Sequence, residues 1–470
     1  MAGSDKRHAS RGTGDNSCTE NPTVELGPQR QEDDFKEGGY GWVVVFAVFM
    51  LNAHTWGLNS SYAVFLAHYL RTGVFGDSQL GYAFVGGLSI SISLLVAPLA
   101  TVLMGWGRCG TRLTIFIGAV FETIAFVGSS FATELWHILL SQGLSFGVGL
   151  GMCFVPSAAV PPQWFVKRRS FASAITASGS GFGGLCYSLA TNAMISRVGL
   201  PWTFRILAIV CFVVNSAASY FIRDRNKAIG SVHVAFDWRL FKRLPFLLFQ
   251  AWAFLSLIAY VILVYSIVDY CQSVGLSASQ ASLAAALFNR IGRPLIGLSS
   301  DAVGRLNIAN ICTLFCGLIC MFFWTFAAKG LAACMVFAVL SGSVAGVIWA
   351  TAAPLCAEIV GIAVIPSALS VTWLVLFLPA TFAEASAVAL RRPGPGAMYI
   401  GAFVFGWALR AWKVGELGEA QLTKEQRELA TRDDGVVASL EHGPQAANQK
   451  PTSAERRRAV FRGLWAIVRV

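Results

Sequence analysis

The chain has 470 residues, of which 55% are hydrophobic and only 13% are charged, and its mean hydropathy is +0.60. A soluble domain of this length would carry about 25% charged residues, so this composition excludes an ordinary globular protein and indicates a chain built for lipid. The net charge of +11 does not indicate nucleic-acid binding, because the basic residues lie mostly in short loops between apolar segments.

The apolar segments are long enough to cross a bilayer as helices. Lipid offers the backbone no hydrogen-bond partner, so a segment of about 20 apolar residues crosses it as an α-helix. Residues 1–38 are polar and lack the apolar core of a signal peptide, which predicts a disordered N-terminal tail. The expected spans are 42–66, 80–104, 113–131, 135–157, 170–192, 204–222, 245–269, 280–300, 306–328, 331–353, 362–388 and 397–412.

A polar linker, residues 223–243, divides these spans into six and six. We therefore predict an all-α membrane protein with six-helix bundles over 39–222 and 244–412. Residues 413–470 form a polar tail that we expect to be disordered. The last span, 397–412, is short, with ~24 Å of helix against a hydrocarbon core of ~30 Å. This indicates either local thinning of the bilayer or residues missing from the gene sequence.

Loop charges orient the chain. Lys and Arg concentrate in cytoplasmic loops of membrane proteins, so the richer side is predicted to face the cytoplasm. With the N-terminus inside, the inner loops carry Arg108, Arg112, Lys167, Arg168, Arg169, Arg223, Arg225, Lys227, Arg239, Lys242, Arg243 and Arg305. The outer loops carry only Arg71, Arg197, Lys329, Arg391 and Arg392. Both termini are predicted to be cytoplasmic, with the plasma membrane as the expected location.

A weak internal repeat supports the two halves. The eighth span runs into Gly297–Arg305, which contains Asp301, and the second span runs into Gly107–Arg112, which keeps Gly and Arg but lacks the acid. The turn requires Gly because its backbone needs a positive φ angle. Two six-span halves with such a turn resemble the major facilitator superfamily, and this resemblance implies two bundles around a central cavity that opens alternately to each side.

Two further motifs resemble one family. Glu37–Trp42, which includes Gly39 and Trp42, is similar to the motif that opens the first helix of monocarboxylate transporters. Trp164–Ala172, which includes Lys167, Arg168 and Arg169, is similar to that family's motif leading into the fifth span. The likeness is to fungal members and covers about residues 37–415. The three basic residues also have a simpler interpretation as a surface cluster that sets topology and contacts lipid headgroups.

The resemblance implies a solute site in the eighth span. In monocarboxylate transporters an Arg at the position of Arg293 belongs to an Asp/Arg pair that engages the substrate carboxylate and its coupled proton. Here Asn289 stands at the Asp position, and Ser60 stands where animal members carry a substrate-linked Lys. Arg293, Asn289 and Arg290 share one helical face, so we expect them to bind an anionic or carbonyl-bearing solute. A structural ion pair or a capping role is the alternative for Arg293.

Other polar and aromatic residues inside the spans are candidates for function. Glu122 lies midway along the third span and either couples protons or makes an interhelical hydrogen bond to Ser or Thr. His54 and Asn59 of the first span are candidate cavity residues. Trp349 and Tyr260, together with Tyr265, either stack a flat solute or pack in the core.

Glycines spaced four apart predict close helix contacts. Gly143, Gly147 and Gly151 in the fourth span, with Gly179 and Gly183 in the fifth, would let helices four and five approach closely.

Signatures of other activities are missing from the sequence. It contains no P-loop, HExxH or CxxC motif, so we expect neither an enzyme nor an ATP-driven pump, and no cofactor. Cys312, Cys316 and Cys320 share a helical face, but apolar neighbours and the lack of a nearby His favour packing over a metal site.

We therefore predict a secondary transporter, proton-linked or facilitative, of a small organic acid or carbonyl-rich metabolite. Its partners would be the solute, protons and membrane lipid, while the oligomeric state stays open. Efflux of a fungal secondary metabolite is the first alternative, and a non-transporting receptor built on a transporter fold is the second.

Overall fold

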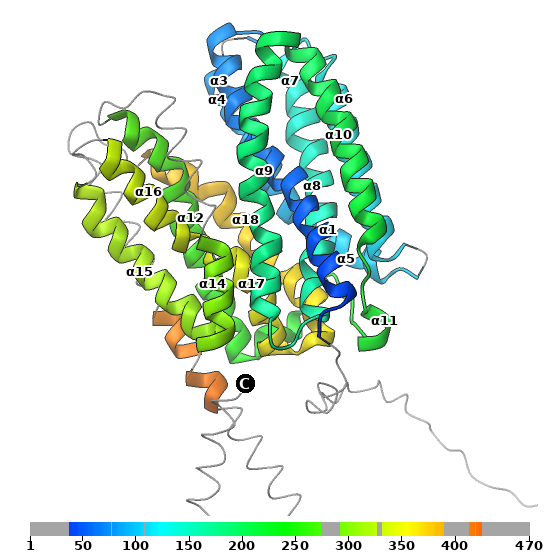
Figure 1. Ribbon diagram of the computed structural model, residues 1–470, viewed down its shortest axis with the longest axis vertical. Helices are drawn as coiled ribbons and strands as arrows, with labels where there is room; N and C mark the ends of the chain where they lie inside the picture. Colours follow the sequence, from blue (N-terminus) through cyan, green and yellow to red (C-terminus); the bar gives the residue numbers. More distant parts are fainter. Residues whose placement is uncertain are drawn as a thin grey trace, which may run out of the picture. The chain divides into compact units, whose positions relative to one another are not determined.

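The structure, a computed structural model, describes residues 37–76, 78–107, 109–273, 292–326, 331–389, 413–418 and 420–424. The chain divides into two compact units, residues 1–35 and 36–470, and every described residue belongs to the second unit. The regular elements of the described part are helices (Figure 1). Among them, eight are long and apolar enough to cross a membrane.

Helices α1 to α10, here called the first helix set, coincide with the first six expected spans. The first and second spans are each broken by a short irregularity, at Thr55 and Ser61 and at Val96. The set comprises α1 Tyr40–His54, α2 Trp56–Ser60, α3 Tyr62–Thr72, α4 Gln79–Leu95, α5 Ala97–Gly105, α6 Gly110–Ser129, α7 Leu135–Ile138, the π-helical η1 Leu139–Ser145, α8 Phe146–Ala159, the 3-10 turn η2 Pro161–Gln163, α9 Arg169–Val198 and α10 Leu200–Phe221.

Helices α12 to α18, here called the second helix set, follow a linker that contains α11 Asn226–Ile229 and the 3-10 turn η3 Trp238–Lys242. The expected twelfth span, 397–412, lies outside the described residues. The set comprises α12 Leu244–Ser273, α14 Gly292–Val303, α15 Arg305–Phe326, α16 Leu331–Ala345, α17 Val347–Val360, the 3-10 turn η5 Ile362–Val364 and α18 Ile365–Ala389.

Glycine conformation at the repeated turn agrees with the sequence prediction. Gly304 separates α14 from α15 with a φ of +114°, and Gly110 begins α6 with a φ of +64°. A side chain is rarely tolerated in this region of φ, so the two related turns require glycine for the same backbone reason.

The helix partners of the predicted glycine stripe differ from the expectation. Gly147 and Gly151 of α8 contact the Ser89 and Ser93 carbonyls of α4, whereas Gly183 of α9 contacts the Ala53 carbonyl of α1. The prediction that these glycines join the fourth span to the fifth is therefore wrong. Each glycine stripe packs on an earlier span. The prediction failed because glycine spacing shows that a helix face permits close approach, but it does not show which helix approaches it.

The linker gathers at one end of the bundle, here called the linker side, which is the lower end in Figure 1. At this end the Tyr40 hydroxyl donates to the Phe221 carbonyl at 2.8 Å, which ties the start of α1 to the end of α10. The linker then runs along the second helix set, where Val232 N donates to Ala363 O and Val234 N donates to Ser367 Oγ, both at 2.8 Å.

The two helix sets meet mainly through α14 against α9 and α18 against α4 and α5 (Figure 1). Gly297 of α14 permits the first of these contacts, since a Cβ there would lie 2.8 Å from the Ser170 carbonyl. A shared apolar core continues across the junction and includes Leu94, Phe154 and Trp373. The sets are thus joined by packed side chains as well as by the linker.

The segment after the expected twelfth span also departs from the prediction. Residues 413–418 and 420–424 are helical, and Leu422 is buried. Gly415 contacts the Asn310 side chain so closely that no Cβ would fit. The prediction of a disordered tail beginning at 413 is wrong for these residues, because two glycines and two apolar side chains give this short stretch a face that packs.

Candidate functional site

The Arg293 guanidinium lies where the two helix sets meet. Arg293 is near the start of α14, and its side chain is only 5% exposed. Its Nη1 donates to the Ala177 carbonyl and the Ser180 hydroxyl of α9, both at 2.7 Å. The Tyr260 hydroxyl of α12 is also hydrogen-bonded to this guanidinium. These partners are all neutral, so the buried cation keeps its capacity for an anionic or carbonyl oxygen.

Two predicted neighbours of Arg293 cannot be placed, because Asn289 and Arg290 lie outside the described residues. The Arg293 Nε finds no acceptor within the described ranges. Tyr260 is a neighbour of Arg293 that the sequence analysis did not pair with it, and it comes from a different helix. The structure thus adds partners from α9 and α12 to Arg293 of α14, while the predicted single-helix face stays a prediction.

An aromatic cluster fills the junction beside this cation, and it consists of Trp56, Phe154, Tyr260, Trp349 and Trp373. The Trp349 ring stacks on Trp373 at 5.8 Å between centroids with 14° between planes. It also meets Trp56 at 5.5 Å and Tyr260 at 6.2 Å. Phe154 packs on Trp56 at 5.3 Å and on Trp373 at 5.1 Å. Both helix sets contribute, so the cluster forms only when they come together.

His54 and Asn59 belong to the first helix set, and the contacts described below lie within it. The His54 Nδ1 lies 2.8 Å from the Met50 carbonyl, which requires a proton on Nδ1, and its ring meets Tyr187 edge-on at 5.5 Å. The Asn59 Oδ1 accepts a hydrogen bond of 2.8 Å from Ser89 Oγ on α4. These contacts account for both side chains structurally, and their role toward a solute stays a prediction.

Glu122 is a fully buried carboxyl group inside the first helix set. Its Oε2 accepts a hydrogen bond of 2.7 Å from Asn215 Nδ2 on α10, and the Cys211 thiol lies 3.7 Å away. Its Oε1 has no donor among the described residues. The expected interhelical hydrogen bond therefore exists, but its partner is an amide and a thiol instead of Ser or Thr. Cys211 also donates to the His54 carbonyl at 3.1 Å, which connects this group to α1.

Asp301 closes the linker side by capping a helix of the other set. Its Oδ1 accepts from Ser170 N at 3.0 Å, and its Oδ2 accepts from Phe171 N at 2.8 Å. These are amides of the first turn of α9, which have no acceptor within their own helix. Arg305 adds a hydrogen bond of 3.0 Å to the Val166 carbonyl and an ion pair of 3.6 Å to Asp301. A carboxylate at a helix N-terminus is stabilised by the helix dipole as well as by its hydrogen bonds.

The two predicted motifs contact each other on the linker side. Glu37 accepts hydrogen bonds from the amides of Val166 and Lys167, and the Trp42 ring packs edge-on against Phe165 at 4.9 Å. Gly39 takes a φ of +61° where the chain enters α1. These contacts hold the start of the first span against the loop that leads into α9.

Arg169 corrects the interpretation of the basic cluster. It is only 5% exposed, and its Nε donates to the carbonyls of Pro162 at 3.2 Å and Phe165 at 3.0 Å. Arg169 is therefore a buried residue that orders the loop before α9. Lys167 and Arg168 are exposed, and their role in topology and headgroup contact stays a prediction.

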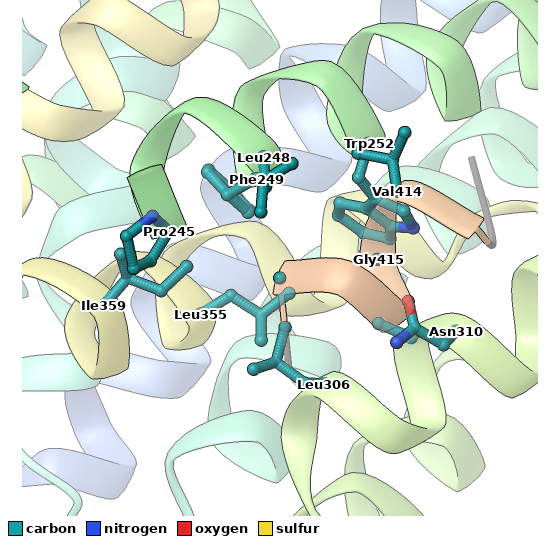
Figure 2. A pocket seen from close by; sticks show the side chains of 12 residues that line it. Pro245, Leu248, Phe249, Trp252, Leu306, Asn310, Leu355, Ile359, Val414 and Gly415 are labelled. Carbon is teal, nitrogen blue, oxygen red and sulfur yellow. The ribbon is translucent and has the colours of Figure 1, made fainter. Parts of the chain in front are cut away.

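A small apolar groove on the linker side belongs to the chain's own packing. Figure 2 shows it between α12, α15 and α17, with Val414 and Gly415 seated over it. Asn310 is its one amide side chain, and Leu248, Trp252 and Leu355 line its walls. Residues 413–418 already occupy the groove, so it is not the solute site.

Sequence reasoning missed several residues of the junction. Ser180, Trp56, Phe154 and Trp373 sit in apolar helices, where their residue types are ordinary. Only their partners in distant spans make them candidates. Cys312, Cys316 and Cys320 are buried in the second set's core, and within the described ranges no group of His, Cys, Asp or Glu is placed to hold a metal ion.

Comparison with known proteins gives one family and several related transporters. Residues 42–384 match the sequence profile of the Major Facilitator Superfamily. The chain is 32% identical over 392 residues to the probable transporter MCH2 of Saccharomyces cerevisiae, which covers 80% of this chain and 82% of the relative. It is 35% identical over 327 residues to the uncharacterized transporter ESBP6 of the same yeast, which covers 66% of this chain and 48% of the relative.

A third relative is named for its cargo. The Agnestins efflux protein AgnL12 of Paecilomyces divaricatus is 26% identical over 330 residues, which covers 68% of this chain and 73% of that protein. All three relatives are fungal proteins named as transporters or efflux proteins.

Proposed function

Because the chain belongs to the Major Facilitator Superfamily, we propose that it moves a small organic acid or carbonyl-rich metabolite by alternating access. Its family and its named relatives confirm the prediction of a multi-pass membrane transporter of a small solute that is not an enzyme. The solute class is the new step, and the observation that carries it is the buried guanidinium of Arg293 with neutral partners.

Arg293 is suited to bind a carboxylate between the helix sets. A guanidinium presents five N–H donors in a rigid fork. The contacts to Ala177 and Ser180 engage Nη1, while Nε has no acceptor among the described residues. An anionic oxygen at the remaining donors would gain charge-assisted hydrogen bonds in a site that excludes water. Solute binding would therefore act on the contact between α14 and α9, which is the contact that alternating access must break and remake.

The structure supports a state closed on the linker side. Asp301, Arg305 and Ser300 of the second helix set all bind the start of α9 or the loop before it. The excess of Lys and Arg in the loops supports a cytoplasmic orientation of this side and of both termini. The plasma membrane stays the proposed location. In this proposal the central site is closed to the cytoplasm, and opening requires release of Asp301 from the α9 amides.

Proton coupling, where present, would use Glu122. Its carboxyl group is fully buried, its Oε1 lacks a donor among the described residues, and it is linked through Cys211 to the α1 backbone at His54. A carboxyl group can bind and release one proton, so we infer that Glu122 does so when the surrounding helices open. Asn59 and His54 stay proposed solute contacts on the same set.

The test is uptake by purified protein in liposomes, with labelled carboxylates, an imposed pH gradient and protein-free liposomes as background. We expect Arg293→Ala to abolish carboxylate uptake while expression and thermal unfolding stay near wild type. Arg205→Ala is the matched control, because Arg205 lies over the Phe131 and Trp202 rings of the first set, away from the junction. Unchanged uptake by Arg293→Ala would remove this residue from the site.

Efflux of a secondary metabolite is the second candidate. The aromatic cluster favours it, since such a surface suits a larger unsaturated solute, and one relative is named as an efflux protein. Deleting the gene and measuring the metabolite inside and outside the cell separates the two candidates. Export predicts accumulation inside the deleted cells, and uptake predicts depletion.

A further inference from the structure

Three buried N–H donors around the aromatic cluster have no acceptor among the described residues. They are Nε1 of Trp56, Nε1 of Trp373 and Nε of Arg293. Trp373 is 2% exposed, and it lies directly beneath Trp349 in the stacked pair. A buried donor left unpaired costs free energy, so three of them in one place indicate a missing acceptor.

Tyr260 connects the two parts of this group. Its hydroxyl is bonded to the Arg293 guanidinium, and its ring meets the Trp349 ring at 6.2 Å. The Tyr260 ring therefore lies between the Arg293 guanidinium and the Trp349 ring, and the two are about one aromatic ring apart. A short aliphatic acid bound at Arg293 would not reach the indoles, whereas an acid with a ring or conjugated chain would.

The less buried side of the cluster is aromatic, with the Trp56 and Tyr260 rings inclined at 51° and 70° to the Trp349 ring. Trp56, Trp349 and Tyr260 are only partly buried, while Phe154 and Trp373 form the floor behind them. Residues from both helix sets supply this wall, so it lies at their junction. Stacking against indole and phenol rings favours planar π-systems over saturated groups of equal size.

Building on the proposed function, we propose that the solute is a planar, conjugated carboxylic acid with a second oxygen at its far end. Its carboxylate binds Arg293, its π-system lies against Trp349 and Tyr260, and its distal oxygen accepts a hydrogen bond from the indole N–H of Trp56 or Trp373. Trp56 and Trp373 are thereby specificity-determining residues, although neither stands out in the sequence.

The test measures equilibrium binding to the full-length protein in detergent by calorimetry, which avoids passive permeation of weak acids. The probes are 4-hydroxycinnamate, cinnamate, cyclohexanecarboxylate and propionate. We expect 4-hydroxycinnamate to bind about tenfold more tightly than cinnamate, because it alone supplies the distal acceptor. Cyclohexanecarboxylate, which is apolar and saturated, is expected to bind more weakly than cinnamate.

Variants show which indole N–H, that of Trp56 or that of Trp373, binds the distal oxygen of the solute. Trp56→Phe and Trp373→Phe keep a ring but remove the N–H, so one or both should abolish the roughly tenfold preference for 4-hydroxycinnamate over cinnamate. Trp202→Phe is the control, because Trp202 is an exposed residue of the first set. Each variant is checked by gel filtration and thermal unfolding, and the probe series on the wild-type protein decides the outcome even where a variant does not fold.

The outcomes separate this inference from the proposed function. Equal affinity for 4-hydroxycinnamate, cinnamate and cyclohexanecarboxylate would show that the cluster is only packing, and the inference would be overturned. Propionate binding that depends on Arg293 would in that case leave the organic-acid function standing. If no carboxylate binds at any concentration, both the inference and the proposed function fail.

Discussion

Asp301→Asn is expected to loosen the closure of the linker side without unfolding either helix set. The Asp301 carboxylate accepts two backbone N–H groups at the start of α9, at 3.0 and 2.8 Å. Asn presents one acceptor oxygen and turns an N–H₂ donor toward the second amide. The substitution therefore removes one of the two hydrogen bonds and the charge that strengthens the other.

The magnitude follows from these contacts. A hydrogen bond to a charged group contributes roughly 1.5–3 kcal/mol, and the ion pair with Arg305, which is partly exposed, adds well under ~1 kcal/mol. We expect a loss of about 2–3 kcal/mol for the closed state relative to the open one, or about 30- to 150-fold in their ratio. A change of this size makes the open state the more populated one where the two states differ by less than about 2 kcal/mol.

Hydrogen exchange followed by mass spectrometry measures this loss of stability of the closed state. The amides of Ser170 and Phe171 are the groups that Asp301 binds, so a peptide covering 165–172 should exchange faster by about the factor given above, because local opening sets the rate. Asp237→Asn is the matched control, since Asp237 also accepts a backbone N–H, from Arg239 at 3.0 Å, but within the linker. Unchanged exchange at Ser170 and Phe171 would refute the reasoning.

Three further predictions concern buried groups. Glu122→Gln should keep the hydrogen bond from Asn215 and fold normally, yet lose uptake driven by a pH gradient while solute exchange persists; equal loss of both would mean that Glu122 only supports the fold. Gly57→Val should destabilise the protein by about 3 kcal/mol or more, because a Cβ there would meet backbone at 2.7 Å, whereas Gly87→Ala has open space; a Tm like wild type for Gly57→Val would contradict the packing. Burial lowers the pKa of His233 below its ordinary value of 6.5. The unfolded chain then binds a proton that the folded chain resists, so Tm should fall as the pH drops below 6.5, less so in His233→Asn.

The helices and the repeated turn were predictable because their signals are local. An apolar run of span length must be a helix in lipid, and a Gly at a tight turn must adopt positive φ, as Gly110 and Gly304 do. These inferences need only the residues of one segment. The position of Arg293 in a buried site followed from the same kind of signal, since a cation in an apolar helix needs a partner.

Partners across the bundle were not predictable in the same way. Asn215 lies 93 positions from Glu122 in the sequence, and either Ser or Thr was an equally reasonable donor for that carboxyl group. Trp56 and Trp349 come from spans one and ten, and their residue types are ordinary in membrane helices. Arg169 shows the opposite error, because a run of three basic residues suggests a surface patch although one of them is buried.

The same pair of helices, α9 and α14, carries both the cation of the proposed site and the gate on the linker side. Arg293 binds Ala177 and Ser180 of α9, and Asp301, two turns further along α14, caps the first turn of α9. A rigid helix transmits a shift at one contact to the other, because neighbouring turns move together. A carboxylate bound at the remaining donors of Arg293 shifts the guanidinium that also holds Ser180, so we expect occupancy of the site to weaken the hold of Asp301 on the α9 amides. Solute binding and gate opening then both act on the contact between α9 and α14, so this contact couples them without a separate pathway through the protein.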